Sequence, residues 1–197
     1  MSEPKNRSLA IALALAAAAA LVYAGLTRQW LVNGNKYEQY GFGLRSTYAC
    51  GQSFGEAHEC DEMSNSEYVA HEREVSSVSA RNTSSAFAPM GWATLVECLL
   101  AAAGLVAAAG IALARKRPDL PMAPTTVTLL ALMAALITGC VFVATKPGAP
   151  GFVGVGISFW IFGAGAVAGI AGAQMLAKVN RPVDPDLMED AMNPEHF

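Results

Sequence analysis

Four long apolar blocks constrain this chain more than any other feature of its sequence. They cover residues 9–27, 92–114, 126–145 and 152–177. A helix needs about 20 apolar residues to cross a bilayer core of roughly 30 Å, so each block is long enough to span a membrane. Hydrophobic residues make up 53% of the chain and charged residues 15%, which favours a membrane protein over a soluble domain. We therefore predict an all-α membrane protein built as a bundle of four transmembrane helices.

The first block has an alternative interpretation. Lys5 and Arg7 precede it, and the small-residue stretch "VYA" at 22–24 resembles the cleavage site of a secretory signal peptide. We expect the block to be retained as the first transmembrane helix.

Basic residues in the short connections predict the orientation. The segment 115–125 begins with "RKR", and such loops face the cytoplasm. Both ends, residues 1–8 and 178–197, are then cytoplasmic, and the multi-pass protein lies in the plasma or cytoplasmic membrane. Residues 28–91 form a long outer loop and 146–151 a short outer turn. The acidic tail 178–197 is predicted to be a flexible, solvated end, with recruitment of a partner as the alternative.

The outer loop begins with a hairpin signal. Asn33 and Gly34 separate two strand-like runs, and this pair favours the tight turn of a β-hairpin. Residues 28–32 and 36–49 are therefore predicted to pair as an antiparallel sheet. Apolar and polar residues alternate through 40–50, as in a half-buried strand. The apolar side of this strand, with Trp30, predicts an interaction surface made of Trp30, Tyr40, Phe42, Leu44 and Tyr48; packing of these residues on the protein's own helices is the equally weighted alternative.

Two cysteines in this loop predict a disulfide bond. Cys50 and Cys60 have nine residues between them and lie on the predicted oxidising side of the membrane. Closing such a loop contributes about 3 kcal/mol by the chain-entropy estimate. The bond would brace a sheet that is too small to be stable alone.

The rest of the outer loop gives weaker signals. The capping residues Ser64 to Ser66 precede a run that places Tyr68, Val75 and Val78 on one side of a short helix. The acidic stretch 56–62, which includes His58, offers cation ligands without a recognisable pattern, so we expect a solvated loop and no metal site. Asn82 begins a glycosylation sequon, which has meaning only in a eukaryotic source.

The arrangement of these residues resembles the claudin and peripheral-myelin-protein superfamily. The matching features are Trp30, Gly43 and Leu44, and the cysteines Cys50 and Cys60. Arg45 stands where the family has a second tryptophan, so the motif is incomplete. The resemblance implies a small outer sheet on a left-handed bundle of four helices. It also implies a role in lateral or intercellular contacts, in ion pores, or as an auxiliary subunit of a larger membrane assembly.

Few residues inside the predicted spans offer chemistry. Glu97 is the one strongly polar residue there, and it is a candidate for partner pairing or conduction, with a structural role as the alternative. Cys98 and Cys140 are expected to pack as small apolar side chains. The histidines all fall outside the spans, which excludes a haem held by histidines within the bundle. Small residues favour close helix packing in the fourth block, at Gly165, Gly169 and Gly172.

These features predict a non-enzymatic membrane protein without a cofactor that contacts other proteins. Its partners would be membrane lipid and other membrane proteins, in homo- or hetero-oligomers. The net charge of −3 argues against nucleic acid as a partner. The alternative is an ion channel or transport subunit that uses Glu97 and the acidic outer loop. A thiol-disulfide oxidoreductase is the less favoured third hypothesis, because Cys98 and Cys140 are not in outer loops.

Overall fold

The structure, a computed structural model, describes residues 4–34, 38–51, 59–75, 83–114, 123–147 and 153–179. Within these ranges four helices are long and apolar enough to cross a membrane, judged by length and composition. This confirms the prediction of four long apolar helices. They are α1 (Pro4–Leu26), α4 (Phe87–Ala114), α5 (Pro124–Ala144) and α6 (Ile157–Val179).

Local sequence explains where two of these helices begin. The amide of Ala86 donates to the Ser84 hydroxyl and the amide of Phe87 to the Ser84 carbonyl, so the helical turns start before the apolar block itself. Pro124 occupies the start of α5, where its missing N–H leaves no helical bond unmade. The start of α6 is later than predicted because residues 154–155 form a strand.

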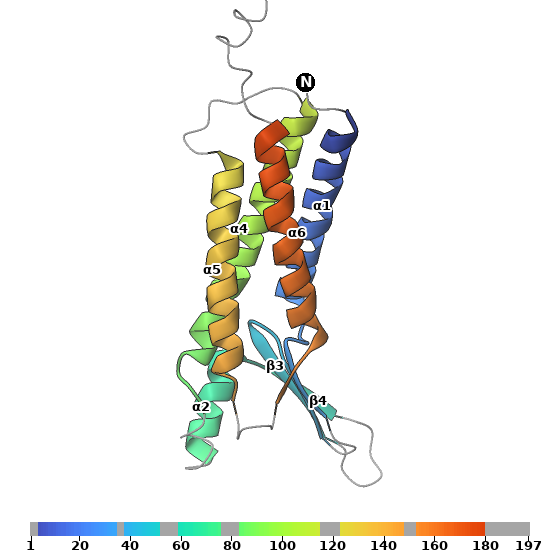
Figure 1. Ribbon diagram of the computed structural model, residues 1–197. Helices are drawn as coiled ribbons and strands as arrows, with labels where there is room; N and C mark the ends of the chain where they lie inside the picture. The colour runs from blue at the N-terminus through green and yellow to red at the C-terminus, as the bar shows by residue number, and fades with distance from the viewer. Residues whose placement is uncertain are drawn as a thin grey trace, which may run out of the picture.

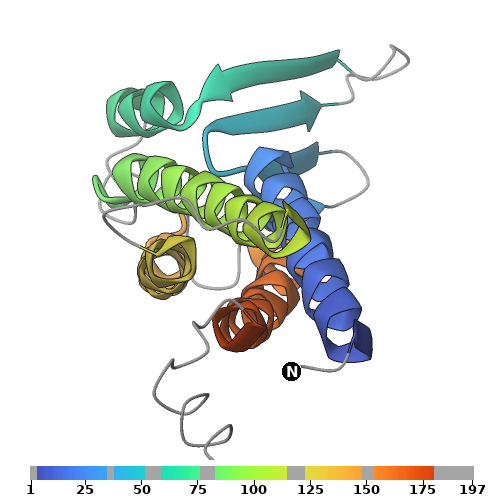
Figure 2. The ribbon, with the colours of Figure 1, turned by 90° about the horizontal axis from the view of Figure 1, so that it is seen from above.

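The four helices form a bundle in which α4 and α6 also contact each other. α1 lies between α4 and α6, and α5 also lies between α4 and α6 (Figures 1 and 2). The beginning of α1 and the end of α6 lie at one end of the bundle, and the sheet and a short helix lie at the other end (Figure 1). The bundle interior is filled by large side chains, so it is a packed core: Leu21, Leu105, Leu132, Phe142, Phe162 and Leu176.

Glycines allow close approach along α6. A Cβ added at Gly165 would lie 3.1 Å from the Ala20 side chain, and one at Gly172 would lie 3.2 Å from the backbone of Ala14. Both of these glycines therefore lie against α1. Gly169 faces the other way, toward Leu132 of α5. The three small residues singled out in the sequence pack inside this one chain.

The described strands form one antiparallel sheet of five, in the order β4-β3-β2-β1-β5. Four of them come from the outer loop: β1 (Leu31–Gly34), β2 (Glu38–Phe42), β3 (Ser46–Gly51) and β4 (Glu59–Ser64). The fifth, β5 (Gly154–Val155), precedes α6 and pairs with β1. The small antiparallel sheet is confirmed, and β5 is an addition that the sequence did not predict.

Two details of the predicted hairpin are wrong. Asn33 and Gly34 are not the turn, because both lie within β1, opposite Tyr40 and Gln39 of β2. Residues 36–49 are not one strand either, since the chain turns at 43–45 between β2 and β3. That turn reverses the strand direction.

Tyr48 consequently lies opposite Gly41 in the register, on the other face of the sheet from Phe42. The single apolar side predicted for residues 40–50 does not exist.

The short helix after Cys60 is α2 (Asn65–Val75). Its first turn carries a capping box: the Glu67 amide donates to the Ser64 hydroxyl, and the Ser64 amide donates to the Glu67 carboxylate at 2.8 Å. Tyr68 and Val69 are buried against the rest of the outer region. The predicted position Val78 lies outside the described residues.

Candidate functional site

Trp30 is the centre of the junction between the sheet and the bundle. Its side chain is fully buried, and its ring contacts Phe142 of α5 and Phe159 and Phe162 of α6. The indole N–H donates to the Ala24 carbonyl at the end of α1. A buried tryptophan with a satisfied N–H is a structural anchor, so the prediction that Trp30 belongs to an exposed interaction surface is wrong.

Phe42 and Leu44 also belong to this junction rather than to an exposed surface. Both are fully buried. The Phe42 ring meets Tyr68 of α2 and Phe87 of α4 edge to face, and Phe87 stacks on Phe142. The prediction that Phe42 and Leu44 belong to an exposed interaction surface is therefore wrong. Both residues pack inside the chain, as the alternative predicted.

The Gly43-Leu44 pair lies between the end of α1 and the start of α4. At these two contacts the backbones are too close for a Cβ atom. A Cβ added at Gly43 would lie 2.7 Å from the Thr27 carbonyl oxygen just after α1. The Leu44 carbonyl lies against Gly91 in the first turns of α4, where an added Cβ would overlap it. Glycine is required at both contacts because only glycine lets two backbones come this close. The motif therefore joins β2 and β3 to the bundle.

Asn65 completes this turn from the start of α2. Its amide Nδ2 donates to the carbonyls of Gly43 and Leu44, both at 3.0 Å, and its Oδ1 accepts from the Thr47 hydroxyl at 2.8 Å. The residue is buried, with 1% of its surface exposed. A buried asparagine with its side chain fully used fixes the turn in one conformation. The sequence did not predict this role, because Asn65 lies between two capping serines while its side chain bonds the distant turn at 43–45.

The segment before α6 fixes the other edge of the sheet. The Gly156 amide donates to the Trp30 carbonyl at 2.8 Å, and the Ser158 amide donates to the Gln29 carbonyl at 3.2 Å. The Thr27 hydroxyl donates to the Ser158 hydroxyl at 2.6 Å. These bonds join the sheet rigidly to the ends of α1 and α6.

The predicted disulfide between Cys50 and Cys60 is confirmed, and it joins opposed residues of β3 and β4. Tyr48, also on β3, lies with its ring over Gly41 of β2, where any side chain would overlap it. Tyr48 and Tyr40 are partly exposed, but they lie on opposite faces of the sheet. They do not form one surface.

Charged residues cover the part of the outer region that stays exposed. β4 is an edge strand, and Asp61 and Glu62 on it are exposed. Glu62 pairs with Arg28 at 2.7 Å. On α2 the exposed residues include Glu67 and, one to two turns later, His71, Arg73 and Glu74. Two hydrogen bonds lower the pKa of the Glu67 carboxyl. The larger effect comes from the Ser64 amide and the smaller from the Ser64 hydroxyl. We call Asp61 on β4 and His71, Arg73 and Glu74 on α2 the outer charged surface, a set defined by exposure and charge on these two consecutive elements.

Glu97 lies on α4 at its contact with α5. The Thr138 hydroxyl donates to Glu97 Oε2, and the Thr94 hydroxyl lies 2.9 Å from that of Thr138. The carboxylate is partly exposed on the outside of the bundle. It does not face the bundle interior, which apolar side chains fill. We call Thr94, Glu97 and Thr138 the polar seam.

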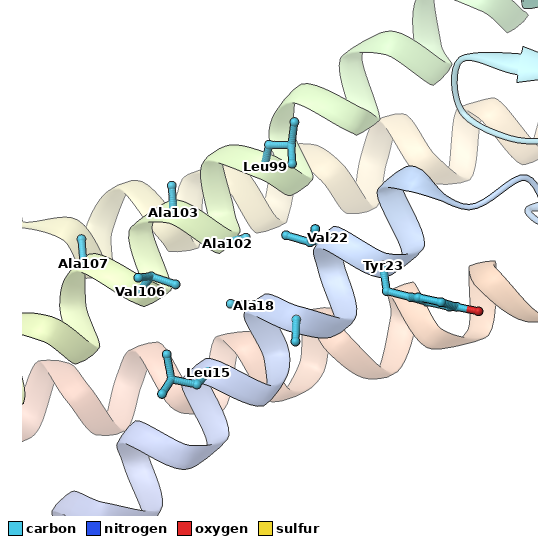
Figure 3. Close-up of a pocket in the computed structure, with 10 residues that line it drawn as sticks. Leu15, Ala18, Val22, Tyr23, Leu99, Ala102, Ala103, Val106 and Ala107 are labelled. Carbon is cyan, nitrogen blue, oxygen red and sulfur yellow. The ribbon is translucent and has the colours of Figure 1, made fainter.

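An apolar groove runs between α1 and α4. Figure 3 shows its lining from both helices, with Tyr23 at one end as its one side chain with a hydroxyl. Such a groove between apolar helices suits acyl chains of lipid, and its lining carries no group that could act as an acid, a base or a metal ligand at neutral pH. The lining residues are Leu15, Ala18, Ala19, Val22, Tyr23, Leu99, Ala102, Ala103, Val106 and Ala107.

The remaining candidate chemistry is not assembled in the part of the chain that the structure describes. No group of three His, Cys, Asp or Glu side chains there could hold a metal ion. Cys98 is buried in α4, Cys140 is exposed on α5, and both are free thiols. His58 and Asn82 lie outside the described residues.

No protein-family model matches this chain, and no curated protein matches it either. The resemblance to claudins therefore depends on the residues themselves. In this structure each motif residue has a structural role: Trp30, Gly43 and Leu44 join the sheet to the bundle, and Cys50 and Cys60 join β3 to β4.

Proposed function

We propose that this protein is a claudin-like, non-enzymatic membrane protein that binds other membrane proteins, as a lateral or intercellular interaction protein or as an accessory subunit. Both chain ends lie in the cytoplasm, and the sheet lies on the outer side of the membrane. The observation that carries the proposal is the rigid attachment of the sheet. Buried aromatic rings, the Trp30 indole bond and the Gly43-Leu44 turn join it to all four long helices, and β5 pairs with its β1 edge.

Rigid attachment supports binding because a surface that is already ordered loses little conformational entropy when a partner docks. Trp30, Phe42 and Leu44 cannot make the contact, since all three are buried inside the chain. The outer charged surface takes that role in the proposal. Conduction is less well supported, because Glu97 lies outside a filled bundle interior. Thiol exchange is also less well supported, because both free thiols lie in the long helices.

Charge reversal on the outer charged surface tests the proposal. The full chain is solubilised from its native membrane in a mild detergent and its complexes are sized on native gels. We expect the wild type to migrate in a larger assembly, and Asp61→Arg combined with Glu74→Arg to release it. Gln39→Arg, which adds a charge at an exposed position of β2 outside that set, is the matched control. A wild-type chain that migrates alone, or an assembly that survives the double reversal, would contradict the proposal.

A further inference from the structure

Glu97 is the one acidic or basic residue in the described core of the four long helices, residues 8–26, 87–114, 124–144 and 157–177. It lies five residues after Trp92, which is about 7.5 Å further along the α4 axis. Trp92 is half exposed, as expected of an anchor at the membrane interface. The carboxylate is therefore inside the hydrocarbon layer and close to its outer boundary.

The protein supplies only part of what this carboxylate needs. Oε2 accepts from the Thr138 hydroxyl, and the Thr94 hydroxyl supports Thr138 from the side. No hydrogen bond from a described residue reaches Oε1. A charged or polar group in lipid is costly unless its bonds are satisfied, so the second oxygen calls for another donor.

No described cation forms an ion pair with Glu97. Arg28 pairs with Glu62 in the sheet region. Lys146, just beyond α5, donates its Nζ hydrogen to the Val153 carbonyl at 2.6 Å. Acidic residues within membranes usually pair with a cation or with backbone, so Glu97 has no counter-ion among the described residues and could accept one from another chain.

The surface around the polar seam lets another helix come close. Ala93 lies one turn before Glu97, and Ala134 lies one turn before Thr138; both are small and partly exposed. Leu100 and Val141 lie one turn on the other side and are exposed. Small residues beside a polar group are typical of helix contacts in lipid, where packing and hydrogen bonds drive association.

We propose that the polar seam docks a transmembrane helix of a different protein, one that carries a lysine or arginine at the depth of Glu97. Charge complementarity favours this partner over a second copy, which would bring a second carboxylate to the same place. The proposal rests on the proposed function, and it names the chemistry of the partner within the membrane.

A designed single-span peptide tests this directly. A leucine-alanine helix flanked by tryptophans carries one Lys five residues inside its outer Trp, and matched peptides carry Leu or Glu there. The purified full chain, labelled at its C-terminus, is reconstituted with each labelled peptide in phosphatidylcholine vesicles, and association is measured by energy transfer. We expect the Lys peptide to bind at least about fivefold more strongly than the Leu peptide, as one good intramembrane contact allows. The Glu peptide should bind no better than the Leu peptide.

Two variants test whether binding needs the carboxylate beside Thr138 or only a negative charge at that depth. Glu97→Gln keeps the side-chain shape and should abolish the preference for Lys. Val96→Glu combined with Glu97→Gln keeps the charge and depth but moves the carboxylate from Thr138 to the exposed neighbouring position, and it should not restore the preference. Helix content by circular dichroism confirms that each variant is folded.

Three results would overturn the proposal: equal binding of the Lys and Leu peptides by the wild type, a Lys preference in either variant, or self-association through Glu97 in place of peptide binding. The peptide has no outer domain, so failure of the outer charged surface in the native-gel test leaves this measurement unaffected.

Discussion

At the residue scale, backbone contact at Gly91 decides whether the turn of the sheet can dock on α4. The Leu44 carbonyl occupies the space that a Cβ at Gly91 would need. Gly110 on the same helix has nothing within 4 Å of the equivalent position. The two glycines thus differ in tertiary environment while sharing the helical backbone.

Gly91→Ala should therefore destabilise the protein by about 1–3 kcal/mol, the usual cost of overpacking. Gly110→Ala should be neutral or slightly stabilising, because alanine favours a helix over glycine by up to about 1 kcal/mol. Thermal unfolding of both variants in the same detergent, followed by circular dichroism, measures the difference. Equal melting temperatures for the two variants would show that Leu44 does not pack on Gly91 as described.

Asn65 shows at the same scale why some contacts could not be predicted. Its partners Gly43 and Leu44 are more than 20 positions away in sequence, and the bonds join the start of α2 to the turn between β2 and β3. Trp30 was misjudged for a related reason. Tryptophan beside a predicted span suits both an exposed interface anchor and a buried junction, and only the positions of Phe142 and Phe162 decide between them.

At the element scale, the elements with strong local signals were predicted well. The long apolar blocks correspond to four helices, the cysteine spacing to the disulfide, and the serines before Glu67 to the start of α2. β5 was missed because two residues, Gly154 and Val155, are too few to show an alternating pattern. The predicted faces of β2 and β3 are wrong because residues 43–45 contain no typical turn pair, so their sequence favours one continuous strand over the observed turn.

The pairing of β3 with β4 depends on the disulfide. β4 is an edge strand with three acidic residues, Glu59, Asp61 and Glu62, and strands rarely favour such residues. Replacing Cys50 and Cys60 together by serine should remove about 3 kcal/mol of stability from this region. We expect rapid amide hydrogen exchange in residues 59–64, with the exchange of α4 and α5 unchanged.

Cys140→Ala is the control for this experiment, since Cys140 is a free, exposed thiol on α5. It should leave the exchange of β4 at the wild-type rate. Slow exchange of β4 in the double serine variant would show that the strand is held by its other contacts, and that the disulfide is dispensable.

At the scale of the whole molecule, the aromatic junction makes the sheet and the bundle one body. Trp30 contacts two helices through Phe142, Phe159 and Phe162, and its indole N–H bonds to the end of α1. Removing this ring should therefore uncouple the two parts more than it unfolds either one.

Trp30→Ala should cost about 3–5 kcal/mol, the range for a large buried aromatic residue. Limited proteolysis in detergent should then cut the outer region while the long helices stay protected. Trp92→Ala is the matched control, because Trp92 is 50% exposed and should cost little. Proteolysis that is as slow in Trp30→Ala as in Trp92→Ala would mean that β5 and the Gly43-Leu44 turn suffice to hold the sheet.

The pairing of β1 with β5 also sets an order for biosynthesis. β1 follows the first long helix and β5 precedes the last, so the β1 edge has no partner until residue 155 has been synthesised. An open strand edge is a template for pairing with other chains. A nascent chain stalled after α5 would therefore expose the backbone of Leu31 and Val32, which β5 covers in the finished protein.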